Sequence, residues 1–175
     1  DMDRSAYLKE LTDAGVTTFK IEGRLKDADY VTNLTAYYRQ KIDEIAPFTN
    51  LHTYQFPFIP SPAKTFHRGG IDYFLHGRTP HMANWQTPKS TGEYIGDAES
   101  TMGNAVRVRP AEGVTLHNGD GLCFGDQGFA VNRIEGDLVF PNTTAVLPSL
   151  KGKRTALYRN LDTEFVRSLH AERHI

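Results

Sequence analysis

The apolar positions near the start of the chain change from a helical to a strand-like spacing. The spacing before Gly15 predicts a short helix that Asp3 or Ser5 could cap, with Gly15 as the residue that ends it. Residues 16–21 are rich in β-branched and aromatic side chains. They predict a buried strand, which Gly23 closes.

A second helix follows this strand. Apolar residues between positions 30 and 45 mark one face of a long helix, which Asp27 or Asp29 could cap and Pro47 would end. A lone strand between two helices needs parallel neighbours, because its backbone groups must be paired. Nothing later in the sequence repeats this unit. We therefore interpret residues 1–46 as the last helix, strand and helix of an α/β domain, at the C-terminal end of a longer protein.

The pattern becomes irregular in residues 47–92. Several prolines break any regular element, as at Pro57, Pro60, Pro62 and Pro80. The segment also carries many large apolar side chains, too many for a free linker. We expect a connector that packs against a domain surface.

Short apolar runs separated by turns fill residues 93–175. Roughly five or six short strands without intervening helices favour a small closed antiparallel barrel, which leaves no exposed sheet edge. The turns starting at Asn118, "NGDG", and at Glu135, "EGD", are typical of hairpins. A short helix that Asp162 could cap is expected to end near Ala171.

Composition indicates the kind of protein and its compartment, but it says little about binding partners. The formal net charge of −1 excludes no partner class, because a balanced total can hide a one-sided patch. A single cysteine, Cys123, forms neither an internal disulfide nor a metal cluster, which indicates a reducing compartment. No apolar run approaches the roughly 18 residues of a membrane span. We expect a soluble, cytoplasmic protein without a membrane partner.

Candidate catalytic and metal-binding groups are sparse. His170 and His174 stand at i and i+4, but no third ligand is arranged with them as zinc sites require, so we expect no metal. Cys123 lies between Leu122 and Phe124, where a buried inert thiol is expected. No nucleophile motif occurs, and the sequence identifies no catalytic residue.

A basic surface on the predicted barrel is the clearest candidate for binding. Alternation along one strand sends Arg107 and Arg109 to the side opposite two valines, and a loop nearby carries Lys151, Lys153 and Arg154. Small barrels often bind nucleic acid through such a face, so these five residues predict RNA contact. The alternative is an ordinary solvated face, because acidic residues are interspersed in the same region.

Several stretches resemble a known family. They are "DAGVTTFKIEGRLKDADYVTNLTAYYRQKID", "KTFHRGGIDYFLHG", "GDGLCF" and "ALYRNLD". They are similar to the C-terminal part of the collagenase-like peptidases, peptidase family U32. The resemblance implies an α+β chain in which a fragment of an incomplete, TIM-like α/β barrel precedes a β-barrel like domain 2 of translation elongation factors.

The resemblance also carries functional expectations. Members are classed as peptidases, and some bacterial members act in the hydroxylation of transfer or ribosomal RNA, for which cysteines in the α/β part matter. Those cysteines would lie upstream of Asp1, so we expect no cofactor in this chain and place any cysteine-bound cluster upstream. His67 and Gly70 depart from the Asn and Phe that the family more often shows.

The same resemblance, with the expected strand, suggests substrate-binding residues. Lys20, Glu22 and Arg24 would lie where a barrel strand meets its following loop, the rim at which α/β barrels bind substrates. Arg68 belongs to the other stretch that is most specific to the family. The alternative for Lys20 and Glu22 is a plain salt bridge at the rim.

Three functional hypotheses remain open. The first is a substrate-positioning module of a collagenase-like peptidase, inactive by itself and completed by an N-terminal α/β domain of the same protein. The second is the RNA-binding part of a protein that hydroxylates transfer or ribosomal RNA. The third is a peptidase to whose active site these residues contribute. An activated nucleophile or metal-bound water is required for peptide hydrolysis and is not recognisable here, which favours the first two. The oligomeric state stays open.

Overall fold

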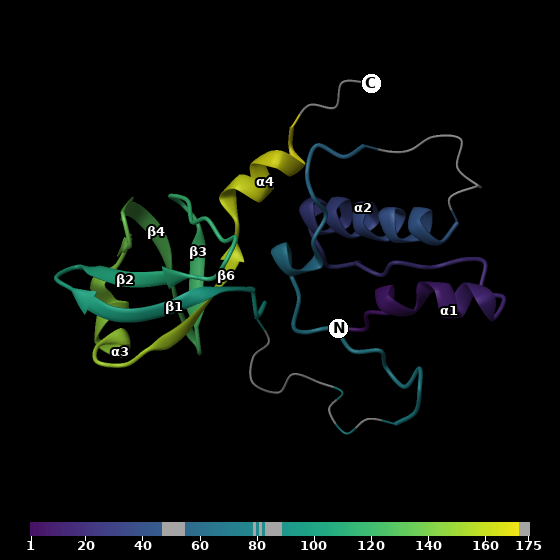
Figure 1. The fold of residues 1–175 in the computed structure, drawn as a ribbon, viewed down its shortest axis with the longest axis horizontal. Helices are drawn as coiled ribbons and strands as arrows, with labels where there is room; N and C mark the ends of the chain where they lie inside the picture. The colour runs from purple at the N-terminus through teal and green to yellow at the C-terminus, as the bar shows by residue number, and fades with distance from the viewer. Residues whose placement is uncertain (47–54, 79, 81, 83–88, 172–175) are drawn as a thin grey trace.

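The N-terminal half of the chain consists of helices and irregular segments, shown in purple and blue in a computed structural model (Figure 1). The structure describes residues 1–46, 55–78, 80, 82 and 89–171. Both predicted helices are confirmed. Asp27 caps the long one by accepting a hydrogen bond from the backbone N–H of Tyr30 at 2.8 Å. Gly15 follows the short one with φ of +97°, as expected of a left-handed helix end. The elements are a 3₁₀ turn η1 (Ser5–Tyr7), α1 (Leu8–Asp13) and α2 (Ala28–Ile45).

The strand predicted at residues 16–21 is wrong. These residues form no strand, and Ile21 is 39 % exposed although it was expected to be buried. A strand needs a neighbour to pair its backbone. Among the described residues, the barrel strands pair with one another, and the remaining bridge joins Met2 to Ile71. The segment has the composition of a strand without a partner strand beside it.

The connector packs as expected in its described part. Phe58 is buried in one cluster with Ala36 of α2 and Phe165 near the C-terminus. Asn33 of α2, fully buried, binds the backbone of Ser61 in both directions, which fixes the entry to a short 3₁₀ turn, η2 (Pro62–Lys64). Trp85 and other connector positions (47–54, 79, 81 and 83–88) lie outside the described residues.

The C-terminal half is the closed antiparallel barrel that the strand pattern predicts. Its six strands follow one another in the order β1-β2-β5-β4-β3-β6, and β6 pairs with β1 to close the ring (Figure 1). Every neighbouring pair is antiparallel. The strands are β1 (Glu93–Met102), β2 (Ala105–Pro110), β3 (Gly121–Phe124), β4 (Gln127–Glu135), β5 (Leu138–Pro141) and β6 (Thr155–Leu161).

Alternating side chains fill the inside of this barrel. Ile95, Val106, Val108 and Leu157 are at most 2 % exposed and belong to one apolar cluster, to which every strand contributes. Leu150 closes the cluster from the short segment η3 (Thr144–Val146) and α3 (Leu147–Leu150). The barrel is therefore a packed core without a lumen.

One predicted hairpin is confirmed and the other is wrong. The turn after Glu135 joins the paired strands β4 and β5. The turn after Asn118 leads into β3, which pairs with β4 and β6 and not with the preceding strand β2. Asp120 explains this, because its buried carboxylate accepts hydrogen bonds from the backbone of His117 and Thr163 and so ties the turn to the C-terminal helix.

The C-terminal helix α4 (Thr163–Leu169) lies between the two halves (Figure 1). Asp162 caps it by accepting from the backbone N–H of Phe165 at 2.9 Å, as predicted. The observed architecture is mixed α+β. The division at residues 46 and 92 and the two finer likenesses, to a TIM-like barrel and to an elongation-factor domain, stay predictions. In the described part of the chain, no helix is both long and apolar enough to cross a lipid bilayer.

Candidate nucleic-acid interface

The alternation predicted for β2 is confirmed. Val106 and Val108 are buried, whereas Arg107 and Arg109 point to the outside of the barrel. Both arginines have acidic neighbours: Arg107 Nε lies 2.9 Å from an oxygen of Asp137, and Arg109 Nη1 lies 3.9 Å from an oxygen of Glu99. Arg109 remains 72 % exposed, so its charge faces solvent.

The loop before β6 lies on the same side of the barrel. Arg154 donates from Nε and Nη2 to one oxygen of Asp97, at 3.0 and 2.6 Å. In β1, Asp97 stands opposite Arg109 of β2, so the two arginines flank one carboxylate. The hydrogen bond from Arg154 holds the pKa of Asp97 below its usual value, and the charge of Arg109 contributes. Lys151 and Lys153 are exposed in this loop.

Of the five predicted RNA-binding residues, Arg107 and Arg109 lie on the outside of β2 and Arg154 binds Asp97 of β1, whereas Lys151 and Lys153 are exposed in the loop before β6. We call this set of Arg107, Arg109, Lys151, Lys153 and Arg154 the basic strip. The structure places the three arginines around β1 and β2, with the two lysines in the loop that carries Arg154. It also pairs three of them with carboxylates, which lowers the net charge that the sequence pattern suggests.

Two tyrosines beside the basic strip were missed by sequence reasoning. Tyr94 of β1 and Tyr158 of β6 stand opposite each other, with ring centroids 5.7 Å apart and 46 % and 37 % of their surface exposed. The Tyr94 hydroxyl donates to Asp97 at 3.1 Å. Their outward direction could have been predicted from strand alternation. Tyr94 precedes the buried Ile95 and Tyr158 follows the buried Leu157, so both side chains point away from the core.

The predicted substrate-binding residues lie in the helical half. Lys20 Nζ is 3.5 Å from Glu22 in an exposed pair, and Arg24 is exposed. Arg68 approaches the N-terminus, where its backbone N–H donates to Asp1 at 2.8 Å. No strand carries the first three residues, so the argument from a barrel rim has no support in the structure.

Lys26, another residue that the sequence did not single out, links these two segments. Its ammonium lies 3.2 Å from the ring centroid of Phe66, and the Arg68 guanidinium lies 5.8 Å from the same ring. Burial and the nearby Arg68 lower the pKa of Lys26. The turn after Gly23 thus packs against the segment containing Arg68.

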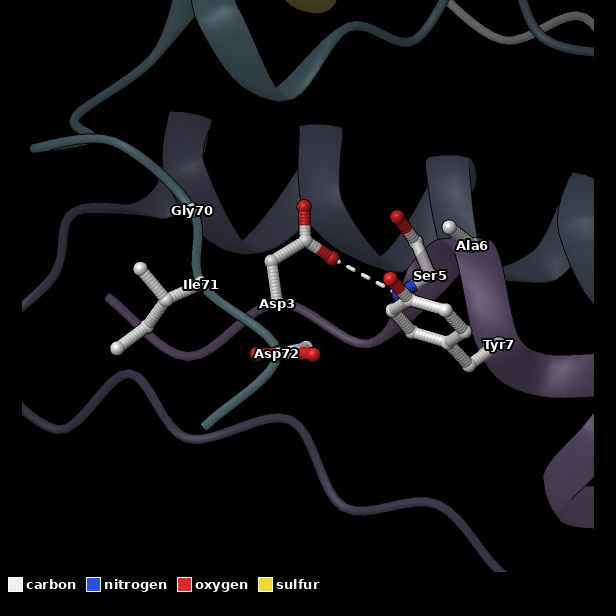
Figure 2. Close-up of a pocket in the computed structure, with 7 residues that line it drawn as sticks. All are labelled: Asp3, Ser5, Ala6, Tyr7, Gly70, Ile71 and Asp72. Atoms are coloured by element: carbon white, nitrogen blue, oxygen red, sulfur yellow. Dashed lines mark hydrogen bonds between the residues drawn. The ribbon is translucent and has the colours of Figure 1, made fainter. Parts of the chain in front are cut away.

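A cavity of about 610 Å³ opens in the same half (Figure 2). Asp3 is one of the residues that line it, and its carboxylate accepts from the backbone N–H of Ser5 and from the hydroxyl of Tyr38, both at 2.9 Å. Burial, with the bond to Asp3, raises the pKa of Tyr38. Figure 2 shows the wall formed by Gly70, Ile71 and Asp72 facing the first turn of the chain. None of the four predicted substrate-binding residues lines this cavity.

A buried ionic network joins the connector, the barrel and α4. Arg159 of β6, whose side chain is 4 % exposed, contacts three carboxylates: Glu93 at 2.8 Å, Asp162 at 2.9 Å and Asp120 at 3.2 Å. Lys64 of η2 binds Glu93 and Asp162 as well. Burial opposes ionisation of Asp162, but hydrogen bonds from Lys64 and the Phe165 backbone keep its pKa below the usual value.

Part of this network resembles a metal-ligand set. Donor atoms of His117, Asp120 and Asp162 lie within 4.8 Å of one another. Both carboxylates already bind Arg159, and their oxygens also accept backbone N–H bonds. A cation placed there would compete with Arg159 and Lys64, so an ion-pair network explains these residues better. His170 pairs with Asp29 at 2.8 Å, and His174 lies outside the described residues.

Comparisons with known proteins agree with the resemblance seen in the sequence. The profile of peptidase family U32 matches residues 1–85. The 23S rRNA 5-hydroxycytidine C2501 synthase of Escherichia coli (strain K12) is 42 % identical over 129 residues, which cover 70 % of this chain and 19 % of the relative. The chain thus spans about a fifth of that relative. No solved structure matches the chain significantly.

The relative's match is longer than the family profile's, so it extends beyond residue 85 into the rest of the chain. The two findings agree with the stretches quoted from both halves. Through its first 85 residues, the chain belongs to peptidase family U32.

Proposed function

We propose that the chain is part of a protein that hydroxylates ribosomal RNA, and that its β-barrel contacts the RNA. One observation carries this proposal: a relative that is 42 % identical is a 23S rRNA 5-hydroxycytidine synthase. The basic strip supplies the positive charges that phosphate groups require, on the outside of a barrel whose core is complete without them.

The role of this part is to hold RNA and not to carry the reacting centre. Its one cysteine, Cys123, is half-buried, and burial raises the pKa of its thiol, which disfavours the thiolate that a metal cluster or a nucleophile needs. The residues present therefore do not fit a cysteine-bound cluster. We assign cysteine-dependent chemistry to another part of the protein.

The same residues argue against a peptidase site in this chain. Peptide hydrolysis needs an activated nucleophile or a metal-bound water. Among the described residues, Cys123 is disfavoured as a nucleophile, and the carboxylates of the one candidate ligand cluster are already bound by cations. The family's classification as peptidases thus has less support here than RNA modification.

The helical half fits a supporting role in the same protein. We propose that residues 1–46 complete an incomplete α/β barrel supplied by the rest of the protein, and that Lys20, Glu22, Arg24 and Arg68 lie near its substrate. Residues 16–21 support this, because they have the composition of a strand but no strand pairs with them in the described part of this chain. A neighbouring strand from the rest of the protein would pair their backbone groups. A likeness of the β-barrel to domain 2 of translation elongation factors is part of the same proposal.

A graft tests the function directly. In an E. coli strain lacking the relative, a version of that protein whose matched segment is replaced by this chain is expected to restore 5-hydroxycytidine in 23S rRNA, measured by mass spectrometry. Replacing Arg107, Arg109, Lys151 and Lys153 together with Ala should abolish the restoration, whereas Arg167→Ala on α4 should not. Restoration that is unaffected by the fourfold change would contradict the role of the barrel in RNA contact.

A further inference from the structure

Two exposed aromatic rings lie side by side on the outside of the barrel. Tyr94 and Tyr158 come from adjacent strands, and their rings meet edge to face with an interplanar angle of 63°. Both strands are anchored by fully buried neighbours, Ile95 and Leu157. The rings are therefore fixed in place by the barrel core although they contribute little to it.

A carboxylate organises the polar groups around these rings. The same oxygen of Asp97 accepts from the Tyr94 hydroxyl at 3.1 Å and from two nitrogens of Arg154, at 2.6 and 3.0 Å. Asp97 is only 13 % exposed, whereas Arg154 is 65 % exposed. Asp97 thus holds the guanidinium beside the Tyr94 ring and leaves part of it open to solvent.

The charges near the rings favour an anionic occupant. Arg154, Arg109, Lys151 and Lys153 are exposed, and the carboxylates paired with them are Asp97 and Glu99. Because the two carboxylates are each paired with an arginine, the two lysines leave the loop that carries Arg154 with an excess of positive charge, although the whole chain has a formal charge of −1. A positive surface that carries exposed aromatic rings is the arrangement with which proteins bind single-stranded nucleic acid.

We propose that Tyr94 and Tyr158 form a stacking platform for unpaired bases of RNA, with Arg154 contacting the adjacent phosphate. The occupant is unpaired RNA and not a duplex, because bases in a duplex are stacked on one another and their faces are not accessible to a ring on a barrel surface. This inference rests on the proposed function. It adds that the bound RNA is unpaired and that Tyr94, Tyr158 and Arg154 contact it.

The test compares a tyrosine variant of the intact chain with a control variant outside the platform. Tyr158→Thr removes one ring at an exposed strand position and keeps a β-branched residue. Arg167→Ala is the control, since it removes an exposed side chain of α4 that lies outside the proposed platform. The probe is a fluorescently labelled 12-nucleotide RNA, used either unpaired or annealed to its complement. Thermal unfolding shows that each variant is folded.

Stacking predicts a change in affinity without a change in salt dependence. Tyr158→Thr should weaken binding of the unpaired RNA about 5- to 150-fold and that of the duplex far less, with the same slope against salt, because the ring touches no phosphate. Arg167→Ala should change either affinity less than about threefold. Equal loss for both RNAs, or none for the unpaired RNA, would overturn the platform.

A second measurement needs no variant. Unpaired RNA containing 5-iodouridine should crosslink the wild-type chain at Tyr94 or Tyr158, identified by mass spectrometry, and crosslinks confined to other residues would overturn the platform.

The outcomes separate this inference from the proposed function. If the wild-type chain binds RNA and loses affinity when Lys151 and Lys153 are changed but not when Tyr158 is changed, RNA contact by the barrel is supported and the platform is contradicted. If wild type binds neither RNA at low salt, both proposals fall.

Discussion

At the scale of single residues, polar groups determine how the two halves meet. Arg159 is buried among three carboxylates that come from β1, from the turn before β3 and from the cap of α4. Its Nη1 also donates to the backbone oxygen of Thr115 at 2.9 Å. Each contact is modest in water, but removing the cation would leave buried carboxylates without their partner.

Replacing Arg159 with Ala should therefore destabilise the chain by about 3–5 kcal/mol. Urea unfolding followed by circular dichroism measures this loss. Arg167→Ala is the control, because that side chain is 75 % exposed and pairs only with Glu164 among the described residues, so it should change stability by less than about 0.5 kcal/mol. Equal effects of the two changes would show that the network is not what stabilises this junction.

His67 should make stability depend on pH. Burial lowers the pKa of His67, and its Nε2 is buried without a hydrogen-bond partner among the described residues. The folded chain therefore binds fewer protons than the unfolded chain, so the free energy of unfolding should fall as the pH drops below about 6.5. His67→Asn should flatten that decline in urea unfolding between pH 5 and 8. An unchanged slope in the variant would show that His67 ionises equally in both states.

At the scale of elements, β1 approaches β2 closely at Gly96, where β1 bends. Gly96 has φ of +128°, and a Cβ placed there would lie 2.1 Å from the backbone oxygen of Arg109. Only glycine fits both conditions. The register of β1 against β6 shifts at the same position, so this residue allows β1 to bend as the ring closes.

Gly96→Ala should cost roughly 3 kcal/mol or more, because it combines backbone strain with a collision that only separation of the strands can relieve. Gly103→Ala provides the comparison: it has a positive φ of +59° but no atom within 4 Å, so strain alone should cost about 1–2 kcal/mol. Thermal and urea unfolding of the two variants measure the difference. Similar losses of stability in the two variants would mean that the close approach of β1 to β2 does not exclude a Cβ atom at position 96.

Local patterns predicted most elements, and the two exceptions needed information from outside the segment. Asp27 and Asp162 were identified as caps because the bonds they make are local. Alternation in β2 was readable because its inner face is fully buried. The strand at 16–21 failed because a strand depends on a partner far away in sequence. The turn at Asn118 failed because the buried contacts of Asp120 outweigh the local preference for a hairpin.

The candidate site was also predicted only in part. The basic strip was identified from charge and alternation, which are visible in sequence. Its carboxylate partners were not, because Asp97 meets Arg154 only when β1 and β6 pair. The outward direction of Tyr94 and Tyr158 was readable from strand alternation, but their contact was not, because it depends on the pairing of β1 with β6.

At the scale of the whole molecule, a family profile covers the helical half, and the similarity to an rRNA-modifying relative extends further along the chain. The two halves are joined by the ionic network and by the contact between Phe58 and Phe165, whose ring centroids are 5.9 Å apart. Under the proposed function, a barrel fixed to the helical half in this way presents RNA to chemistry carried out elsewhere in the protein.

The salt dependence of RNA binding tests this account most directly. Fluorescence anisotropy of the intact chain with a fragment of 23S rRNA should show log affinity falling linearly with log salt, by about 0.7 per phosphate contact on single strands. Replacing Arg107 and Arg109 together with Ala should lower the magnitude of that slope by about 0.7 to 1.4 and leave the fold intact, whereas Arg167→Ala should not change it. Absence of binding at low salt, or an unchanged slope in the double variant, would contradict RNA contact through this side of the barrel.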